Sequence, residues 1–426
     1  MRFAPLPSIR RLDNPTPVCY NNINEGKEAS VMRIAGMICE CNPLHAGHQY
    51  LMEQAKRGGA DVLIALMSGC FVERGEPAVA DGFVRAKALL AGGADVVLEL
   101  PFPFSASSAE HFARAGVEIL SRLGVHELWF GSECGSIETL STLAGICDSP
   151  EFVARYAASV RSNGGSAKKY FEILSDLAGK DCACSPNDIL GIAYLRAIRM
   201  HDSAMIPRTV QRLGSGYGEK RLNAEFPSAT ALRIALAEGG IDAVSPYLAP
   251  TTRSSLAEAL EEGRAPAGWK HAERLILGAL RMLSDEEIAS IAELSGGLGA
   301  RLRDAARKAD SFEALLTLVA TKKYTTARIQ RGILYALTGI RDEDLRAPCT
   351  YVRLLGANEV GRRALAACKR TSAIPVVTRR QDVPAEGEAQ CRLAERAWKL
   401  YTLCLPRSAS ASDYWRKKPI LLPKEP

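Results

Sequence analysis

Short apolar runs alternate with amphipathic stretches along the first half of the chain. The runs predict buried strands over 31–41, 61–67, 94–100 and 127–130. The stretches between them predict helices over 48–57, 85–91 and 112–123. Strands and helices that alternate in this way are typical of βαβ units, so we predict an α/β fold whose Rossmann-like parallel sheet is covered on both faces. Such sheets bind ligands at the carboxyl ends of their strands.

The strand pattern fades after about residue 236. Helical periodicity, rich in Ala, Leu and Arg, then predicts helices over 254–262, 269–284, 298–319, 325–339 and 386–404. We therefore expect an α/β nucleotide-binding domain over 32–235 and a mainly helical domain over 236–426. Residues 1–31 have no apolar period, and we expect them to be a disordered leader or Met32 to be the natural start. The tail over 415–418 is expected to be flexible.

The composition excludes several protein classes. Of the 426 residues, 47% are hydrophobic and 24% are charged, which is the balance of a globular protein and not of a disordered chain, a collagen or a coiled-coil rod. No apolar run approaches the roughly 18–20 residues that cross a bilayer, so no membrane partner is expected. The 12 cysteines include no C-x-x-C pair, a usage typical of a reducing compartment, and we expect a cytoplasmic protein.

Charge is distributed unevenly along the chain. Residues 301–426 carry 25 Lys and Arg against 13 Asp and Glu, whereas residues 1–300 carry 29 against 35. An acidic first part followed by a basic second part fits an enzyme body joined to a region that binds a polyanion. The densest basic segment runs from Thr321 to Arg331. Its Lys322, Lys323, Arg328 and Arg331 are candidate phosphate contacts, and Tyr324 is a candidate to stack on a base; a solvated charged helix face is the alternative.

The strongest chemical signal is the segment Glu40–His48, which reads ECNPLHAGH. Its H-A-G-H opens a helix directly after the first predicted strand. Gly47 permits close approach of a ligand, and the helix start offers free N–H groups. His45 and His48 share one helical face, an arrangement suited to the phosphates of a nucleoside triphosphate. The four residues match the H-x-G-H signature of adenylyl-transferring Rossmann-like enzymes, so we expect His45 and His48 to be catalytic.

Two alternatives remain open for this segment. The histidines can be ordinary residues at a helix start. Cys39 and Cys41 together with His45 and His48 also spell C-x-C-x₃-H-x₂-H, which can bind zinc. The two cysteines point the same way from a strand whose face should pack against a helix, where free cysteine behaves as a small hydrophobic residue. We therefore predict no metal site.

A second motif lies far along the chain. Enzymes with H-x-G-H usually close the site with a Ser/Thr-rich loop that ends in Arg or Lys and binds the leaving phosphates. The segment Ser228–Arg233, SATALR, fits this pattern and precedes a helix. We expect Arg233 and Ser228 to be catalytic, although Ser228 can also serve only as a helix cap.

Four further segments have the composition of ligand loops. The segment over 68–77, SGCFVERGEP, follows the second strand and mixes glycines with charges. Gly131 follows the fourth strand, where a glycine lets a base or ribose lie on the backbone. Asn187 stands at the start of a helix and can bond a nucleotide. Arg212 precedes a Gly-rich turn suited to a phosphate or an adenine.

The order of these blocks resembles that of the tRNA(Met) cytidine acetate ligases. The resemblance covers about residues 32–365, and it rests on ECNPLHAGH, SGCFVERGEP, RAKALLAGGADVVLELPFPF, FGSE, SPNDILGIAYL, QRLGSGY, SATALR, TKKYTTARIQRGIL and VRLLGANEVGRR. The blocks of the second half distinguish this family from the adenylyltransferases of cofactor biosynthesis, which share only H-x-G-H and the Ser/Thr loop.

The resemblance implies a reaction and its partners. ATP, expected with Mg²⁺, and acetate would form acetyl-adenylate and release pyrophosphate. The acetyl group would then pass to the exocyclic amine of the wobble cytidine of elongator tRNA(Met), which leaves AMP. Neither the pattern nor the resemblance defines an oligomeric state.

The resemblance also assigns ATP contacts residue by residue. They are Ile38, Cys39, Glu40, Cys41, Asn42, Pro43, Leu44, His45, Ala46, Gly47, His48, Gln49, Tyr50, Leu51, Gly131, Asn187 and Arg212. This chain departs from the family pattern at Cys39 and Cys41, where relatives mostly carry Val and an aromatic residue. It also departs at Glu73, where Gln is frequent.

Two other functions remain to be distinguished from this one. The chain can be an adenylyltransferase that makes a small cofactor, with the basic half used for assembly. It can also be a non-catalytic RNA-binding protein that retains a degenerate nucleotide fold. The presence of His45, His48 and Arg233 argues against the second.

Overall fold

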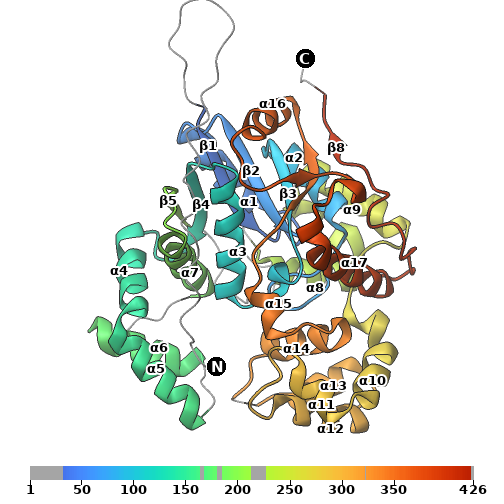
Figure 1. Ribbon diagram of the computed structural model, residues 1–426. Helices are drawn as coiled ribbons and strands as arrows, with labels where there is room; N and C mark the ends of the chain where they lie inside the picture. Colours follow the sequence, from blue (N-terminus) through green and yellow to red (C-terminus); the bar gives the residue numbers. More distant parts are fainter. Residues whose placement is uncertain (1–31, 164–166, 180–184, 213–226, 322, 424–426) are drawn as a thin grey trace, which may run out of the picture.

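A computed structural model describes residues 32–163, 167–179, 185–212, 227–321 and 323–423. The expectations for the leader over 1–31 and for Lys322 lie outside these residues. The described strands are β1 (Ile34–Cys39), β2 (Val62–Ser68), β3 (Val96–Leu100), β4 (Glu127–Ser132), β5 (Ile206–Gln211), β6 (Val352–Ala357), β7 (Val376–Val377) and β8 (Ile420–Leu421). They form one sheet in the order β5-β4-β1-β2-β3-β6-β7, with β8 paired to β6 (Figure 1). Strands β1 to β5 run parallel, and β6 pairs antiparallel with β3.

Helices cover both faces of this sheet, as the alternating pattern predicts. The helices of the first half are α1 (Ala46–Arg57), α2 (Gly82–Ala91), α3 (Ala109–Arg122), α4 (Ile137–Asp148), α5 (Pro150–Asn163), α6 (Ala167–Ala178) and α7 (Pro186–Met200). Apolar residues of α1 and α2, such as Met52 and Leu89, pack with Met37 of β1 in one cluster. Residues of α3 and α7 pack with the opposite side of the strands in another. The predicted α/β fold is therefore confirmed.

The second half is mainly helical. Its helices are α8 (Ala229–Val244), α9 (Pro250–Glu261), α10 (Glu273–Met282), α11 (Asp285–Ser290), α12 (Leu298–Lys308), α13 (Phe312–Val319), α14 (Thr326–Thr338), α15 (Asp342–Arg346), α16 (Glu359–Cys368) and α17 (Glu388–Leu403). Helices α10, α12, α13, α14 and α17 share a separate apolar core. The single helix expected over 298–319 is two helices, because Ser311 caps α13 by accepting a hydrogen bond from the N–H of Ala314.

The sequence pattern misses the strands described in this half, β6, β7 and β8, of which β6 is the longest. Residues 352–357, VRLLGA, form β6, and all six are buried. This apolar run is short and is followed by a basic helix, α16, while its partner β3 lies about 250 positions earlier in the chain. Only the completed sheet explains why it is extended, because pairing across such a separation leaves no local signal. The mainly helical half thus also supplies strands to the central sheet.

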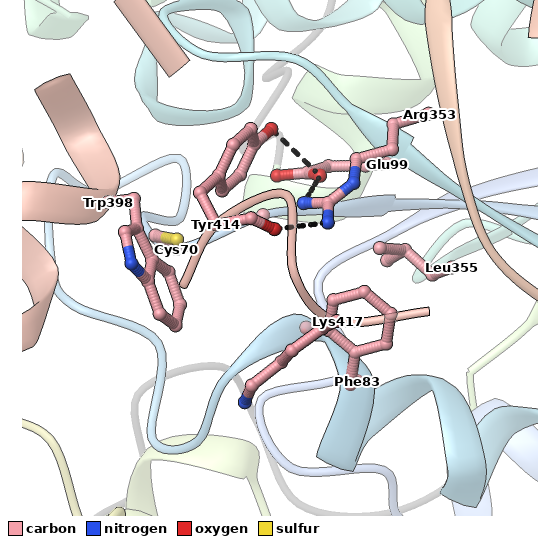
Figure 2. A pocket seen from close by; sticks show the side chains of 10 residues that line it. Cys70, Phe83, Glu99, Arg353, Leu355, Trp398, Tyr414 and Lys417 are labelled. Carbon is pink, nitrogen blue, oxygen red and sulfur yellow. Dashed lines mark hydrogen bonds and ion pairs between the residues drawn. The ribbon is translucent and has the colours of Figure 1, made fainter. Parts of the chain in front are cut away.

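The segment 413–418 packs against β6 and α2, which does not fit the flexible tail expected from the sequence. Figure 2 shows Tyr414, Arg353 and Glu99 joined by hydrogen bonds and an ion pair. The Arg353 guanidinium carbon lies 4.2 Å from the centroid of the Tyr414 ring. Lys417 Nζ lies 2.8 Å from a carboxylate oxygen of Asp81. Tyr414 and Lys417 line a pocket together with Gly69 and Cys70 of the loop that follows β2 (Figure 2). Within the described residues, no helix is both long and apolar enough to cross a bilayer.

Candidate active site

The two histidines of H-A-G-H lie together at the start of α1. His45 is the N-cap residue, with φ −136° and ψ 172°, and its Nδ1 accepts a hydrogen bond of 3.1 Å from the N–H of Gly47. His48 Nδ1 accepts one of 3.4 Å from the N–H of His45. The ring centroids are 4.1 Å apart. The pair thus forms a reciprocal capping box made of imidazoles.

This pairing fixes which nitrogen of each ring is a donor. Because Nδ1 accepts in both rings, the proton of the neutral imidazole resides on Nε2. Burial, together with the positive charge of Arg212, lowers the pKa of His45 to about 4. Burial also holds the pKa of His48 well below its usual value, with added repulsion from His45 and Arg212. At neutral pH the site therefore offers two neutral N–H donors at a helix N-terminus, where anions are favoured.

Gly47 is required by the position of the His45 ring. A Cβ atom at residue 47 would lie 3.0 Å from His45 Cε1 and 3.2 Å from Nδ1. A side chain there would press on the ring, which would have to shift by a few tenths of an ångström. The glycine between the histidines therefore leaves room for the His45 ring in its capping position.

Arg233 reaches the same place from the second half of the chain. Its Nη1 donates to the carbonyl oxygen of Asn42 at 3.0 Å, three residues before His45. Its Nη2 donates to Thr230 Oγ1 at 3.4 Å and pairs with Glu76 at 3.2 Å. The Arg233 side chain is 20% exposed. The Ser/Thr loop and the histidine turn are thus brought together.

Ser228 is the N-cap of α8. Its Oγ accepts a hydrogen bond of 3.1 Å from the N–H of Ala231. Asn42 is buried, and its Oδ1 accepts a hydrogen bond of 2.7 Å from the N–H of Val79. Its Nδ2 has no hydrogen-bond partner within the described part of the chain. An unpaired buried donor beside Arg233 is costly unless a ligand uses it.

Gly131, Asn187 and Arg212 gather around Glu133, at the ends of β4 and β5 and the start of α7. Glu133 accepts a hydrogen bond of 2.6 Å from Asn187 Nδ2, and its Oε1 lies 3.6 Å from Arg212 Nε. Gly131 lies against the Arg212 side chain. Glu133 is not among the site residues predicted from the sequence, although an acid directly after a strand end is a usable signal. Since β4 lies between β1 and β5, this group flanks the histidine turn.

The segment 38–51 divides into core and surface. Ile38, Cys39, Cys41 and Leu44 are buried in the apolar clusters of the sheet. Pro43 is also buried, whereas Glu40, His45, Ala46, Gly47, His48, Gln49 and Leu51 are half-buried and Tyr50 is exposed. The cysteine sulfurs belong to a packed core, and burial raises the pKa of the Cys41 thiol well above its usual value. No group of three or more His, Cys, Asp or Glu that could hold a metal occurs in the described residues.

The basic segment before α14 fits its expected role only in part. Lys323 is exposed; it donates to the carbonyl oxygen of Gly296 at 3.0 Å and lies over the Tyr324 ring. Arg328 also lies over that ring and donates to the carbonyl oxygens of Glu293 and Ser295. Tyr324 is therefore buried beneath two cations and is not placed to stack on a base.

Arg331 does not fit the role of a phosphate contact. Its side chain is 9% exposed and lies 3.1 Å from Glu293 and 3.5 Å from Glu73. A helical position alone does not tell which basic residue faces inward, and these two carboxylates draw Arg331 into the interior. We therefore correct this expectation: its charge is balanced within the protein.

Comparisons with known proteins show which family the chain is similar to. The family model HIGH Nucleotidyl Transferase matches residues 32–415. The tRNA(Met) cytidine acetate ligase of Syntrophotalea carbinolica is 37% identical over 82% of this chain and 85% of its own. That of Acetivibrio thermocellus is 33% identical over 89% and 96%.

Solved structures of a related protein have a similar fold. The crystal structure of apo Thermotoga maritima TmcAL matches with a TM-score of 0.87 and 28% identity, over 92% of this chain and all of that one. The crystal structure of the same protein bound with alpha-thio ATP matches with a TM-score of 0.83 and the same coverage.

Proposed function

The chain belongs to the family of tRNA(Met) cytidine acetate ligases, and on that premise we propose that it is an ATP-dependent ligase that acetylates a cytidine of elongator tRNA(Met). The chemical assignment rests on one observation: Arg233 donates a hydrogen bond to the carbonyl oxygen of Asn42, in the turn that leads to His45 and His48. Three groups that favour phosphate oxygens thereby converge at the carboxyl end of a parallel sheet.

The first half-reaction activates acetate. A carboxylate oxygen of acetate attacks the α-phosphorus of ATP, and the bond from that phosphorus to pyrophosphate breaks. The N–H groups of His45 and His48 stabilise the charge that develops on the phosphate oxygens, and Arg233 holds the departing pyrophosphate. The unpaired Nδ2 of Asn42 is a further donor for this transition state. The product is acetyl-adenylate.

The second half-reaction transfers the acetyl group. The exocyclic amine of the wobble cytidine attacks the acyl carbon, an amide bond forms, AMP leaves, and the amine loses one proton. The amine is weakly basic, so orientation contributes more than deprotonation. The cytosine base must leave its stack in the tRNA to reach the site at the carboxyl ends of the strands. Gly131, Asn187 and Arg212 are proposed to hold the adenosine part, with Glu133 orienting the last two.

Binding of tRNA is proposed for the segment before α14. Exposed Lys323, its neighbour Lys322 and the partly exposed Arg328 would contact phosphates. Since the cysteines of the described residues form no disulfide, we also propose a cytoplasmic location. The described residues supply no carboxylate cluster for Mg²⁺, so we assign it only to the phosphates of ATP, as part of that substrate.

Exchange of labelled pyrophosphate into ATP tests this proposal. We expect exchange that depends on acetate and does not need tRNA. Exchange that instead requires a phosphorylated cofactor precursor would indicate a cofactor adenylyltransferase. Binding of tRNA without any exchange would indicate a non-catalytic RNA-binding protein.

A further inference from the structure

The loop between β2 and α2, residues 69–81, lies between the phosphate site and the helical region. On one side the loop contacts the segment between β1 and the histidines, since the N–H of Glu73 donates to Glu40 Oε1 at 2.8 Å. On the same side Glu76 Oε2 lies 3.2 Å from Arg233 Nη2. The loop therefore touches two elements that build the phosphate site.

The other side of the loop rests on α14. Gly75 has φ +75°, and a Cβ atom there would lie 2.5 Å from the backbone nitrogen of Arg331, so the loop backbone sits directly on that of the helix. Trp269 Nε1 donates to the carbonyl oxygen of Gly75 at 3.1 Å. Gln330 Nε2 donates to Glu76 Oε1 at 3.4 Å. The loop is thus fixed to the helical region by backbone packing and by side-chain contacts.

Glu76 is the residue that joins the two sides. One of its oxygens accepts from Arg233, which serves the phosphates, and the other accepts from Gln330 of α14. The contact with the Gln330 amide, which lies on a packed helix, limits the directions that the carboxylate can take. An arginine paired with it keeps its guanidinium plane in one orientation, because the paired oxygen limits the rotamers of a long side chain.

We propose that Glu76 is a positioning residue for ATP activation: braced by Gln330, it holds the Arg233 guanidinium in line with the histidine pair. This inference rests on the proposed function, because it assigns Arg233 to the phosphates of ATP. It adds that the helical region, through α14, fixes the geometry of the nucleotide site.

Electrostatics and positioning predict opposite effects when Glu76 is changed. If the carboxylate acted only through its charge, its removal would strengthen ATP binding, and Glu76→Ala and Glu76→Gln would behave alike. If it positions Arg233, Glu76→Ala loses the contact, whereas the amide oxygen of Glu76→Gln still accepts from the guanidinium. The sign of the change in Kd therefore separates the two roles.

The test is titration of the full-length variants with ATP, together with acetate-dependent pyrophosphate exchange. We expect Glu76→Ala to weaken ATP binding by about tenfold, the effect of one lost charged hydrogen bond, and to lower the exchange kcat further. Glu76→Gln should restore the Kd to within about threefold of the parent. Gln330→Ala should weaken binding less than Glu76→Ala, and it should add nothing in the Glu76→Ala background, because both act through one contact.

Glu343→Ala and Gln381→Ala are matched controls, since both side chains are exposed and lie outside the site. They should bind ATP like the parent. Unchanged or tighter ATP binding by folded Glu76→Ala would overturn the inference, as would independent effects of the Glu76 and Gln330 changes. A parent protein that binds ATP but shows no acetate-dependent exchange would refute the proposed function instead, and the ATP affinities would still decide the role of Glu76.

Discussion

Arg233 Nη1 donates to the carbonyl oxygen of Asn42 at 3.0 Å, although 191 positions of sequence separate the two residues. Asn42 begins the turn that ends at His45, the N-cap of α1. The contact joins the Ser/Thr loop to the histidine motif through protein atoms alone. ATP can therefore meet a preorganised set of donors, and such donors stabilise transition-state charge without reorganisation.

Replacing His45 by Asn separates catalysis from folding. Asn is a good N-cap residue, so α1 should keep its cap and the free energy of unfolding should change by less than about 1 kcal/mol. The imidazole donor is lost, and we expect acetate-dependent pyrophosphate exchange to fall by about 10²-fold or more. Denaturant unfolding and initial exchange rates measure the two effects. Full exchange activity in a folded variant would remove His45 from the mechanism.

Replacing Lys322 and Lys323 together by Ala should weaken tRNA binding but not ATP activation. Each lost phosphate contact lowers the slope of log K against log salt by about one unit. Binding of tRNA at several salt concentrations measures this slope, and pyrophosphate exchange without tRNA should match the parent. Equal losses of tRNA binding and exchange would show that the segment has only a structural role.

Arg331→Ala should destabilise the fold. Its loss leaves Glu73 without its buried arginine partner and leaves Glu293 paired with Arg328 alone; breaking a buried pair in this way costs about 3–5 kcal/mol. Arg346→Ala is the matched control, since its pair with Asp342 is exposed and is worth less than about 1 kcal/mol. Denaturant midpoints compare the two variants. If Arg331→Ala instead kept full stability and lost tRNA affinity, the original assignment to phosphate binding would be restored.

Glu73 should make stability depend on pH. Burial raises the pKa of its carboxyl from 4.5 to about 7, with Glu40 adding repulsion and Arg331 opposing the shift. The unfolded chain releases this proton near pH 4.5 and the folded protein near pH 7. The folded state therefore holds the extra proton between these values, and its stability falls as pH rises through them.

The Glu73→Gln variant lacks this titratable carboxyl. The free energy of unfolding of the variant should therefore fall less than that of the parent between pH 4.5 and about 7. Equilibrium unfolding across this range tests it, with exposed Glu343→Gln as control. Parallel curves for the parent and Glu73→Gln would show that the carboxyl does not titrate in this window.

The sequence predicts the first four strands because each is a contiguous apolar run closed by a turn. It does not predict β6, whose pairing with β3 is non-local. The same limit applies to side-chain direction on α14. Arg328 and Arg331 look equivalent in sequence and both pair with Glu293, yet Arg331 also pairs with Glu73 and is 9% exposed, against 20% for Arg328.

The nearness of Arg233 to the histidines is predictable only from chemistry. No local pattern links residue 233 to residue 42, but a triphosphate needs donors at both ends, and the two motifs supply them. The roles of Glu133 and Glu76 were not predictable in this way. Each is defined by the arginine that it orients, and that pairing depends on the folded arrangement of several elements.

The most direct test of the central claim is mass analysis of tRNA nucleosides after incubation of the protein with ATP, labelled acetate and unmodified elongator tRNA(Met). The predicted result is labelled acetylcytidine at the wobble position only, formed with one AMP per acetyl group and lost in Arg233→Ala. Unlabelled cytidine at that position, with ATP consumed or not, would contradict the account.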